Sequence, residues 1–247
     1  MVTEEASAGS GANRGVLYVV ATPIGNLDDI THRAVKVLST VDVIAAEDTR
    51  TTKILLDHYR IRKPMLSYFS RNEGTRAPQL IARLHQGQSV ALVSDAGTPG
   101  ISDPAYVVVR QAVEEGIPVV PIPGPTAFIS ALVVSGLPTD RFVFEGFLPQ
   151  KKGRRTKFEQ LKAERRTVVL YESPHRIRKT LAEILEHLGD RRVVVAREMT
   201  KKFEEIVRGR VHAVIEELGR KEPRGEYVVI LEGTDARERD SDTDSGM

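Results

Sequence analysis

The chain has 247 residues, 40% of them hydrophobic, which is enough for one large or two small domains with an ordinary core. It has no cysteine and its six histidines are not closely paired, so disulfides and cysteine-ligated metals are excluded and we expect no metal site. No apolar run approaches the roughly 20 residues that span a bilayer, and the N-terminal stretch lacks the apolar core of a secretory signal, so we expect a cytoplasmic protein.

The first half of the chain alternates short apolar runs with helical patterns. We expect strands at 16–23, 43–48, 64–68, 90–97 and 118–124, and helices at 29–41, 50–59, 77–87, 103–116 and 125–136. Asp103 is expected to cap the fourth helix, with Pro104 in its first turn. Such alternation is typical of βαβ units around a largely parallel sheet.

This rhythm breaks at 137–153, where we place a domain boundary. Beyond it we expect strands at 142–147, 167–174, 191–198, 204–211 and 226–233, and helices at 151–165, 175–189 and 211–220. The sequence therefore predicts an N-terminal α/β domain at 15–137 and a C-terminal α/β domain at 138–234. The polar ends, 1–14 and 235–247, are expected to be disordered.

The small net charge of +2 hides an uneven distribution. Residues 150–180 contain eleven Lys and Arg but only three Glu, a local net charge of +8. Acids that could pair with these cations at i,i+4 spacing are scarce in the segment. We interpret it as a surface for a polyanion such as a nucleic acid, with a solvated helix face as the alternative.

Five loops follow the strands of the first half and are expected to meet at one edge of the sheet. The most informative is SDAGTPGISDP at 94–104, whose small residues let a ligand approach the backbone. Ligands of open α/β sheets bind beyond the carboxyl ends of the strands. None of the loops contains G-x-G-x-x-G or a P-loop, so we expect a small-molecule site without a phosphate cradle.

A set of motifs in fixed order carries a family resemblance. They are TPIGNLDDIT, AAEDTR, SDAGTPGISDP, PGPTA, EGFLPQKKGRR, YESPHR and GEYV, spread from about Gly15 to Gly233. In this order and spacing they resemble the tetrapyrrole-methylase superfamily and, within it, the bacterial methyltransferases of small-subunit ribosomal RNA. Where tetrapyrrole enzymes have Gly-Gly-Asp after the fourth strand, this chain has Asp95-Ala96-Gly97, which argues against a tetrapyrrole substrate.

The resemblance implies two α/β domains of the class III methyltransferase fold, with S-adenosylmethionine as methyl donor in a cleft between them. It also implies a homodimer that methylates the 2'-oxygen of a cytidine in the decoding region of small-subunit ribosomal RNA, as free RNA or in the assembled subunit, and not DNA. A tetrapyrrole C-methyltransferase and a non-catalytic RNA-binding assembly factor are the alternatives. By motif, the cofactor residues are Pro23, Asp95, Ala96, Gly97, Ile101, Thr126, Ala127, Tyr171, Gly225 and Tyr227.

Methyl transfer to a hydroxyl needs in-line geometry and a group that takes the proton. We assign Glu47 and Asp48 to substrate handling and catalysis, with capping of the following helix as the alternative. Glu172 is the third catalytic candidate, with pairing to Arg176 as its alternative. The residues expected to contact RNA are Arg50, Lys151, Lys152, Arg154, Arg155 and Arg176.

Other residues are further candidates for the same site. Asp95 and Glu198 are further acids at strand ends, and Glu198 has pairing with Arg197 or Lys201 as its alternative. His175 is expected to face solvent, with a role as a base near neutral pH as the alternative. For the three phenylalanines of 142–147 we expect core packing, with base stacking by one exposed ring as the alternative.

Overall fold

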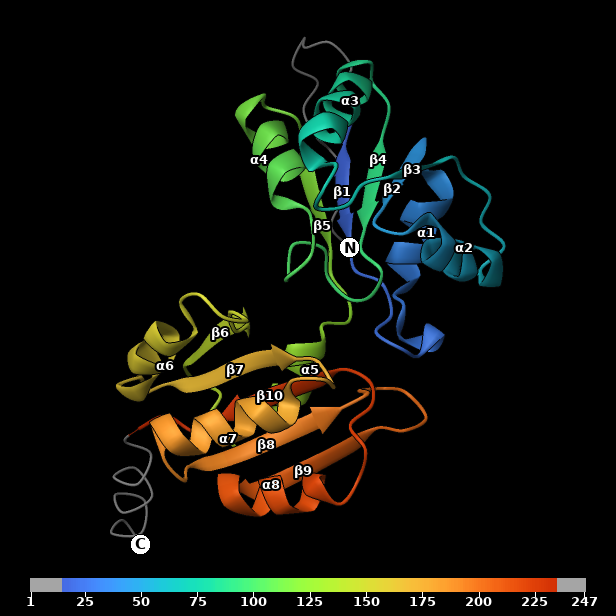
Figure 1. The fold of residues 1–247 in the computed structure, drawn as a ribbon. Helices are drawn as coiled ribbons and strands as arrows, with labels where there is room; N and C mark the ends of the chain where they lie inside the picture. The colour runs from blue at the N-terminus through green and yellow to red at the C-terminus, as the bar shows by residue number, and fades with distance from the viewer. Residues whose placement is uncertain (1–14, 235–247) are drawn as a thin grey trace, which may run out of the picture. The chain divides into compact units, whose positions relative to one another are not determined.

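A computed structural model describes residues 15–234, which form two compact units (Figure 1). The first contains the described residues up to Pro23 together with Leu27–Pro125, and the second contains Ile24–Asn26 and the described residues from Thr126 onward. This division precedes the expected boundary at 137–138, because helix α5 (Ala127–Val133) packs on strands of the second unit. The ends expected to be disordered, 1–14 and 235–247, lie outside the described residues.

The first unit is a parallel sheet covered by helices on both faces. Its strands are β1 (Leu17–Val20), β2 (Val43–Ala46), β3 (Met65–Ser67), β4 (Val90–Val93) and β5 (Val119–Ile122), in the order β3-β2-β4-β1-β5. A 3-10 turn η1 (Leu27–Asp29) precedes α1 (His32–Thr40), and the other helices are α2 (Thr49–His58), α3 (Glu73–His85) and α4 (Tyr106–Glu114). Since α1 and α2 bury one face and α3 and α4 the other, the central strands β2 and β4 are apolar throughout.

Several helix starts differ from the sequence prediction by up to four residues, and those of α4 and α3 have an identifiable local feature. Helix α4 begins at Tyr106 with Ala105 as N-cap, so the prediction that Asp103 caps it is wrong. Ser102, the residue before Asp103, takes a left-handed backbone with φ 66°, and the bend continues through Pro104. Helix α3 begins at Glu73, earlier than expected, and therefore contains Pro78 near its start, where the missing N–H costs a single helix bond.

The second unit is built on a mixed sheet. Its strands are β6 (Phe142–Phe147), β7 (Thr167–Glu172), β8 (Arg192–Arg197), β9 (Glu205–Arg210) and β10 (Tyr227–Leu231), in the order β6-β7-β10-β8-β9. Only β6 and β7 pair in parallel. Helices α6 (Arg154–Lys162), α7 (Ile177–Leu188) and α8 (Val211–Gly219) bury one face and α5 packs on β7 and β10 (Figure 1). The predicted α/β class is confirmed, and no helix among residues 15–234 is long and apolar enough to cross a membrane.

Strand β6 carries a β-bulge that changes which way its side chains point. The register with β7 shifts between Phe144 and Gly146, and Gly146 takes φ 62°. Phe142 and Phe144 pack against Phe128 of α5, with ring centroids 6.1 and 4.3 Å away, as the core-packing prediction expected. Phe147 is 54% exposed and does not follow that prediction.

Candidate functional site

The loops after β1 and β4 are locked together at the carboxyl edge of the first sheet. The backbone N–H of Thr22 donates to the Gly97 carbonyl at 2.8 Å, and the Gly97 N–H donates to the Thr22 carbonyl at 3.0 Å. The buried Thr22 hydroxyl also donates to the Ser94 carbonyl at 3.2 Å. Gly97 has φ 84°, which a residue with a side chain adopts only under strain. This bridge fixes the short Asp95-Ala96-Gly97 segment.

The predicted cofactor residues of the first unit lie along this edge. Asp95 and Ala96 are exposed at the tip of the loop, whereas Gly97 and Pro23 are buried beneath it. Ile101 is half-buried a few residues further along the same loop. The structure therefore presents one carboxylate and a stretch of small residues to solvent.

Two carboxyl groups beside the loop have raised pKa values. The Asp48 N–H donates to Asp95 Oδ1 at 2.9 Å, and the Asp95 N–H donates to Glu47 Oε2 at 3.3 Å. Burial, together with the neighbouring Asp95 and Asp48 carboxylates, raises the pKa of Glu47. Burial and the Asp48 carboxylate likewise raise the pKa of Asp95. A carboxylate with a raised pKa is a stronger base than an ordinary one.

Asp48 stands in a different environment from Glu47. Its Oδ1 accepts the Arg50 N–H at 2.8 Å and so caps α2, which is the alternative that the sequence left open. Its two carboxylate oxygens also accept from the Arg50 guanidinium, at 3.1 Å from Nε and 2.6 Å from Nη2. These hydrogen bonds lower the pKa of Asp48 to about 2 and leave the Arg50 side chain 90% exposed. Asp48 is therefore a weak base that orients a surface cation.

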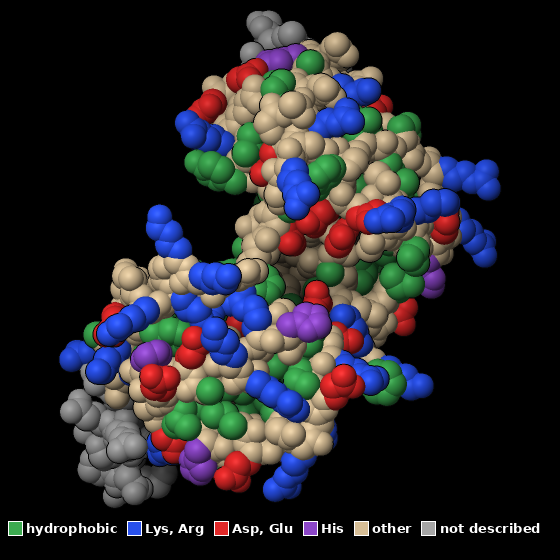
Figure 2. All heavy atoms as spheres, in the orientation of Figure 1, with side chains coloured by type: hydrophobic (Ala, Val, Ile, Leu, Met, Phe, Trp, Pro, Cys, Tyr) green, Lys and Arg blue, Asp and Glu red, His purple; other side chains and the backbone are tan. Residues whose placement is uncertain are grey.

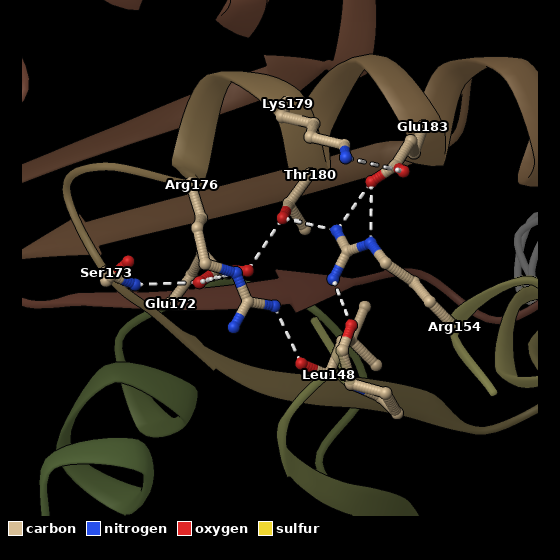
Figure 3. Close-up of polar contacts among 9 residues, drawn as sticks. Leu148, Arg154, Glu172, Ser173, Arg176, Lys179, Thr180 and Glu183 are labelled. Atoms are coloured by element: carbon tan, nitrogen blue, oxygen red, sulfur yellow. Dashed lines mark hydrogen bonds and ion pairs between the residues drawn. The ribbon is translucent and has the colours of Figure 1, made fainter. Parts of the chain in front are cut away.

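Glu172 lies at the centre of a buried polar network in the second unit (Figure 3). It accepts from the Thr180 hydroxyl at 2.6 Å and from the Ser173 N–H at 2.8 Å, and its Oε1 lies 3.2 Å from Arg176 Nε. Arg154 Nη2 donates to the same Thr180 hydroxyl at 2.7 Å. All of these partners are internal, so the geometry supports the alternative of pairing with Arg176 over the predicted catalytic role.

Two of the arginines expected to contact RNA point inward. The Arg154 side chain is 7% exposed; its Nε lies 2.9 Å from Glu183 Oε2 and its Nη1 donates to the Pro149 carbonyl at 3.0 Å. Arg176, 23% exposed, donates from Nη2 to the Leu148 carbonyl at 2.6 Å. The expectation of two surface cations is corrected here, because Glu183 pairs with the guanidinium of Arg154 and the buried Glu172 pairs with that of Arg176.

The remaining cations of the basic segment stay at the surface. Lys151 and Lys152 are exposed in the loop before α6, and Arg155 is 88% exposed in its first turn, 4.0 Å from Glu159. Figure 2 shows Lys and Arg side chains gathered over the part of the second unit that carries α6. The predicted polyanion surface therefore persists, with fewer free charges than the sequence indicates.

Three predicted cofactor residues of the second unit meet at the start of α5. Thr126 is the N-cap of this helix and Ala127 its first residue. The Tyr171 hydroxyl accepts the Phe128 N–H at 3.3 Å, so it caps the same helix end. The pattern PGPTA signals this helix start, but nothing local in the sequence signals the contact from Tyr171.

Gly225 lies in the tightly packed bend before β10, and Tyr227 is the first residue of that strand. Tyr227 is 2% exposed, packs in the core and accepts the Arg224 N–H on its hydroxyl at 3.3 Å, so its ring is not available to cover an adenine as predicted. Gly225 has φ 75°, and a Cβ there would lie 2.4 Å from Glu198. Glu198 itself bonds Lys201 at 2.9 Å, the alternative that the sequence analysis gave. His175 is exposed, as expected.

Sequence reasoning missed Thr180 and Glu183, which complete the Glu172 network from α7. Glu183 is 29 positions from Arg154 in the chain, so no local pattern links them. The three-residue spacing of Thr180 and Glu183 places these two polar side chains on one face of α7, but it does not indicate their partners. No group of three His, Asp or Glu in the described residues is arranged to hold a metal ion.

Comparison with known proteins identifies the family. Residues 16–215 match the family described as Tetrapyrrole (Corrin/Porphyrin) Methylases. The chain belongs to the tetrapyrrole methylase family. The resemblance that the motifs indicated is thereby confirmed, and membership makes the protein a methyltransferase.

Relatives of this tetrapyrrole methylase share about half of its residues. A protein of Thermotoga maritima named "Ribosomal RNA small subunit methyltransferase I" is 52% identical over 219 residues, 89% of this chain and 99% of the relative. One of the same name from Escherichia coli O157:H7 is 50% identical over 237 residues, 94% of this chain and 83% of the relative.

Solved structures support the fold of this tetrapyrrole methylase. The uroporphyrin-III C-methyltransferase of Thermus thermophilus, solved with S-adenosylhomocysteine, superimposes with a TM-score of 0.62 over 88% of this chain and 97% of that chain. The two are 20% identical, so the likeness shows the fold alone.

Proposed function

We propose that the protein methylates small-subunit ribosomal RNA, and that the acceptor is the 2'-hydroxyl of a cytidine in the decoding region. The observation that carries this proposal is the half-identity, over nearly the whole chain, to relatives named for that RNA. The exposed cations Lys151, Lys152 and Arg155 support a polyanionic acceptor. The ribose oxygen and the cytidine come from the motif resemblance.

We infer that S-adenosylmethionine is the methyl donor and that the edge of the first sheet holds it. When bound, this cofactor supplies a methyl group on a positively charged sulfur. The carboxylates of Glu47 and Asp95 suit such a cation, and the small side chain of the exposed Ala96 lets a ligand approach the tip of the loop. Pro23 and Ile101 flank that position, whereas the roles assigned by motif to Thr126, Ala127, Tyr171 and Gly225 stay predictions.

Among the acids, Glu47 is the best candidate to take the hydroxyl proton. Its raised pKa makes it a stronger base than Asp48, whose pKa of about 2 reflects the hydrogen bonds to Arg50. Glu47 accepts the proton as the ribose oxygen bonds to the methyl carbon, and the electron pair of the broken carbon–sulfur bond stays on sulfur. Asp48 meanwhile holds Arg50 at the surface, where it is available to a phosphate.

Cofactor binding is tested by thermal unfolding with and without S-adenosylmethionine. We expect a rise in Tm that grows with cofactor concentration. Gly97→Ala introduces a side chain at φ 84° in the proposed cofactor loop and should reduce the rise. Gly136→Ala is the matched control, because Gly136 has φ 78° with open space around it and belongs to the second unit. Absence of any rise in the native protein would contradict the proposal.

The acceptor is tested by offering isolated small subunits, free small-subunit RNA and a uroporphyrinogen to the protein with labelled cofactor. We expect label in RNA and none in the uroporphyrinogen. The reverse result would favour a tetrapyrrole C-methyltransferase, and no transfer to any acceptor would favour an assembly factor that keeps the fold.

We also propose that the protein is a cytoplasmic homodimer. Helix α5 and the residue after it leave Ile129, Val133 and Val134 exposed by 40, 67 and 43%, which favours an apolar interface between copies. Sedimentation equilibrium should give twice the chain mass, and Val133→Glu should shift the protein toward the monomer. A native protein that sediments as a monomer at micromolar concentration would contradict the dimer.

A further inference from the structure

The bulge in β6 turns an aromatic ring toward solvent. Phe147 is 54% exposed, whereas the next residue, Leu148, is buried in the core of the second unit. In a regular strand Phe147 would point to the face opposite Phe144, but the register shift places it opposite Tyr171, with ring centroids 5.6 Å apart. Bulges recur next to functional sites because they re-aim a side chain.

The ring behind Phe147 is held rigidly. Tyr171 packs edge-on against Phe144 at 5.2 Å, and its hydroxyl accepts the N–H of Phe128 at 3.3 Å. Tyr171 is therefore fixed at both its ring and its hydroxyl. Phe147 therefore packs on one side against a side chain that is held in place, and its other side is exposed.

The segment after Phe147 is fixed from inside the unit, as Figure 3 shows for Leu148. The Leu148 carbonyl accepts from Arg176 at 2.6 Å, and the Pro149 carbonyl accepts from Arg154 at 3.0 Å. Arg176 pairs directly with the buried Glu172, and Arg154 is linked to it through the Thr180 hydroxyl. The Glu172 network therefore fixes the backbone of the two residues that follow Phe147.

Exposed cations follow this fixed segment in the chain. Lys151 and Lys152 follow four and five positions after Phe147, and Lys151 cannot lie more than about 14 Å from it along the chain. An aromatic ring beside cations that follow the backbone is the arrangement by which proteins bind single-stranded nucleic acids. A phosphodiester strand complements the charge, whereas a purely apolar partner would leave both lysines unused.

We propose that Phe147 is a stacking residue on which an unpaired base of the RNA substrate lies, with Lys151 and Lys152 on the adjacent phosphates. Glu172, Arg154 and Arg176 are positioning residues that hold the segment in register with the ring. The inference rests on the proposed function, which identifies the RNA substrate. The stacking of a base on Phe147 does not depend on that identity.

The test is fluorescence anisotropy of the full chain with two labelled probes of equal length. One is single-stranded oligouridylate, and the other is the same ribose-phosphate strand without bases. Phe147→Leu should weaken binding to oligouridylate about tenfold, the effect of losing one stacked base, and leave the abasic strand unaffected. Phe147→Trp should restore the affinity.

Matched variants separate stacking from charge. Phe203 is 64% exposed in the loop between β8 and β9. Phe203→Leu therefore removes a ring of similar exposure from another part of the second unit, and this variant should bind both strands normally. Replacement of Lys151 and Lys152 by alanine should weaken binding to both strands and reduce the salt slope by about 0.7 for each lysine.

Three outcomes would overturn the inference. The first is that Phe147→Leu and the native chain bind oligouridylate equally. The second is that Phe147→Leu loses the same affinity for oligouridylate as for the abasic strand. The third is a changed sedimentation coefficient for Phe147→Leu, which would assign the ring to contact with a second copy of the chain. Methyl transfer to small subunits is measured in parallel, where Phe147→Leu should raise KM and leave kcat unchanged. A native protein that transfers no methyl to RNA refutes the proposed function, while the anisotropy still decides the stacking.

Discussion

At the scale of single residues, neighbours in the chain acquire opposite properties. Glu47 and Asp48 follow the same strand, but burial raises the pKa of the first and Arg50 lowers that of the second. The capping role of Asp48 could be predicted, because an aspartate before a helical pattern is a local signal. The contact of Glu47 with Asp95 could not, because it depends on β2 and β4 being neighbours in the sheet.

Asp48 should contribute to stability in a pH-dependent way. Its pKa is lowered from 3.8 to about 2, so its stabilising charge is fully present above about pH 4 and is lost as the pH falls through 2. Asp48→Asn keeps the ability to cap α2 and removes only the charge. We expect the variant to be less stable at neutral pH and to lose less stability between about pH 4 and 2. Urea unfolding across this range checks it, and parallel curves for both proteins would contradict it.

Glu47 and Glu172 should respond differently to loss of charge. Glu47→Gln removes the proposed proton acceptor and should lower kcat by about 10²- to 10⁴-fold without changing the Tm rise caused by the cofactor. Glu172→Gln should keep most of the native kcat at a temperature where it is folded. Single-turnover methyl transfer compares the two, and the opposite ranking would return Glu172 to the catalytic role that the sequence predicted.

At the scale of elements, the order of strands and helices follows from the sequence, whereas their special backbone positions do not. Apolar runs and Gly-Pro loops predict every strand, because buried strands need uninterrupted apolar residues. The bulge at Gly146 left no such pattern, since one extra residue changes the facing of Phe147 without changing the composition of β6. The start of α4 was missed because the aspartate and proline that normally begin a helix, Asp103 and Pro104, still belong to the loop that contains the left-handed Ser102.

The Glu172 network should be a main source of stability for the segment between β6 and α6. Glu172→Ala removes the carboxylate that the half-buried Arg176 and the buried Thr180 hydroxyl share, and we expect a loss of about 1–3 kcal/mol. Glu159→Ala, at a side chain that is 59% exposed, is the control and should change stability by less than about 0.5 kcal/mol. Urea unfolding measures both, and equal small effects would show that the network contributes little.

At the scale of the whole molecule, the distribution of charge says more than its sum. The net charge of +2 conceals a segment of +8, for which a polyanion surface stays a prediction, although not every cation of the segment lies at the surface. Arg154 and Arg176 were counted as surface cations because a sequence does not show that Glu183 and Glu172 will pair with them. Of the residues of this segment that were expected to contact RNA, Lys151, Lys152 and Arg155 stay exposed.

The most direct test of the account is to locate the methyl group. Small subunits that lack the modification are incubated with the protein and labelled S-adenosylmethionine, and the digested RNA is analysed by mass spectrometry. The account predicts a single 2'-O-methylcytidine in the decoding region, absent when Glu47→Gln replaces the native protein. A methyl group on a base, label in a tetrapyrrole instead of RNA, or full activity of Glu47→Gln would contradict it.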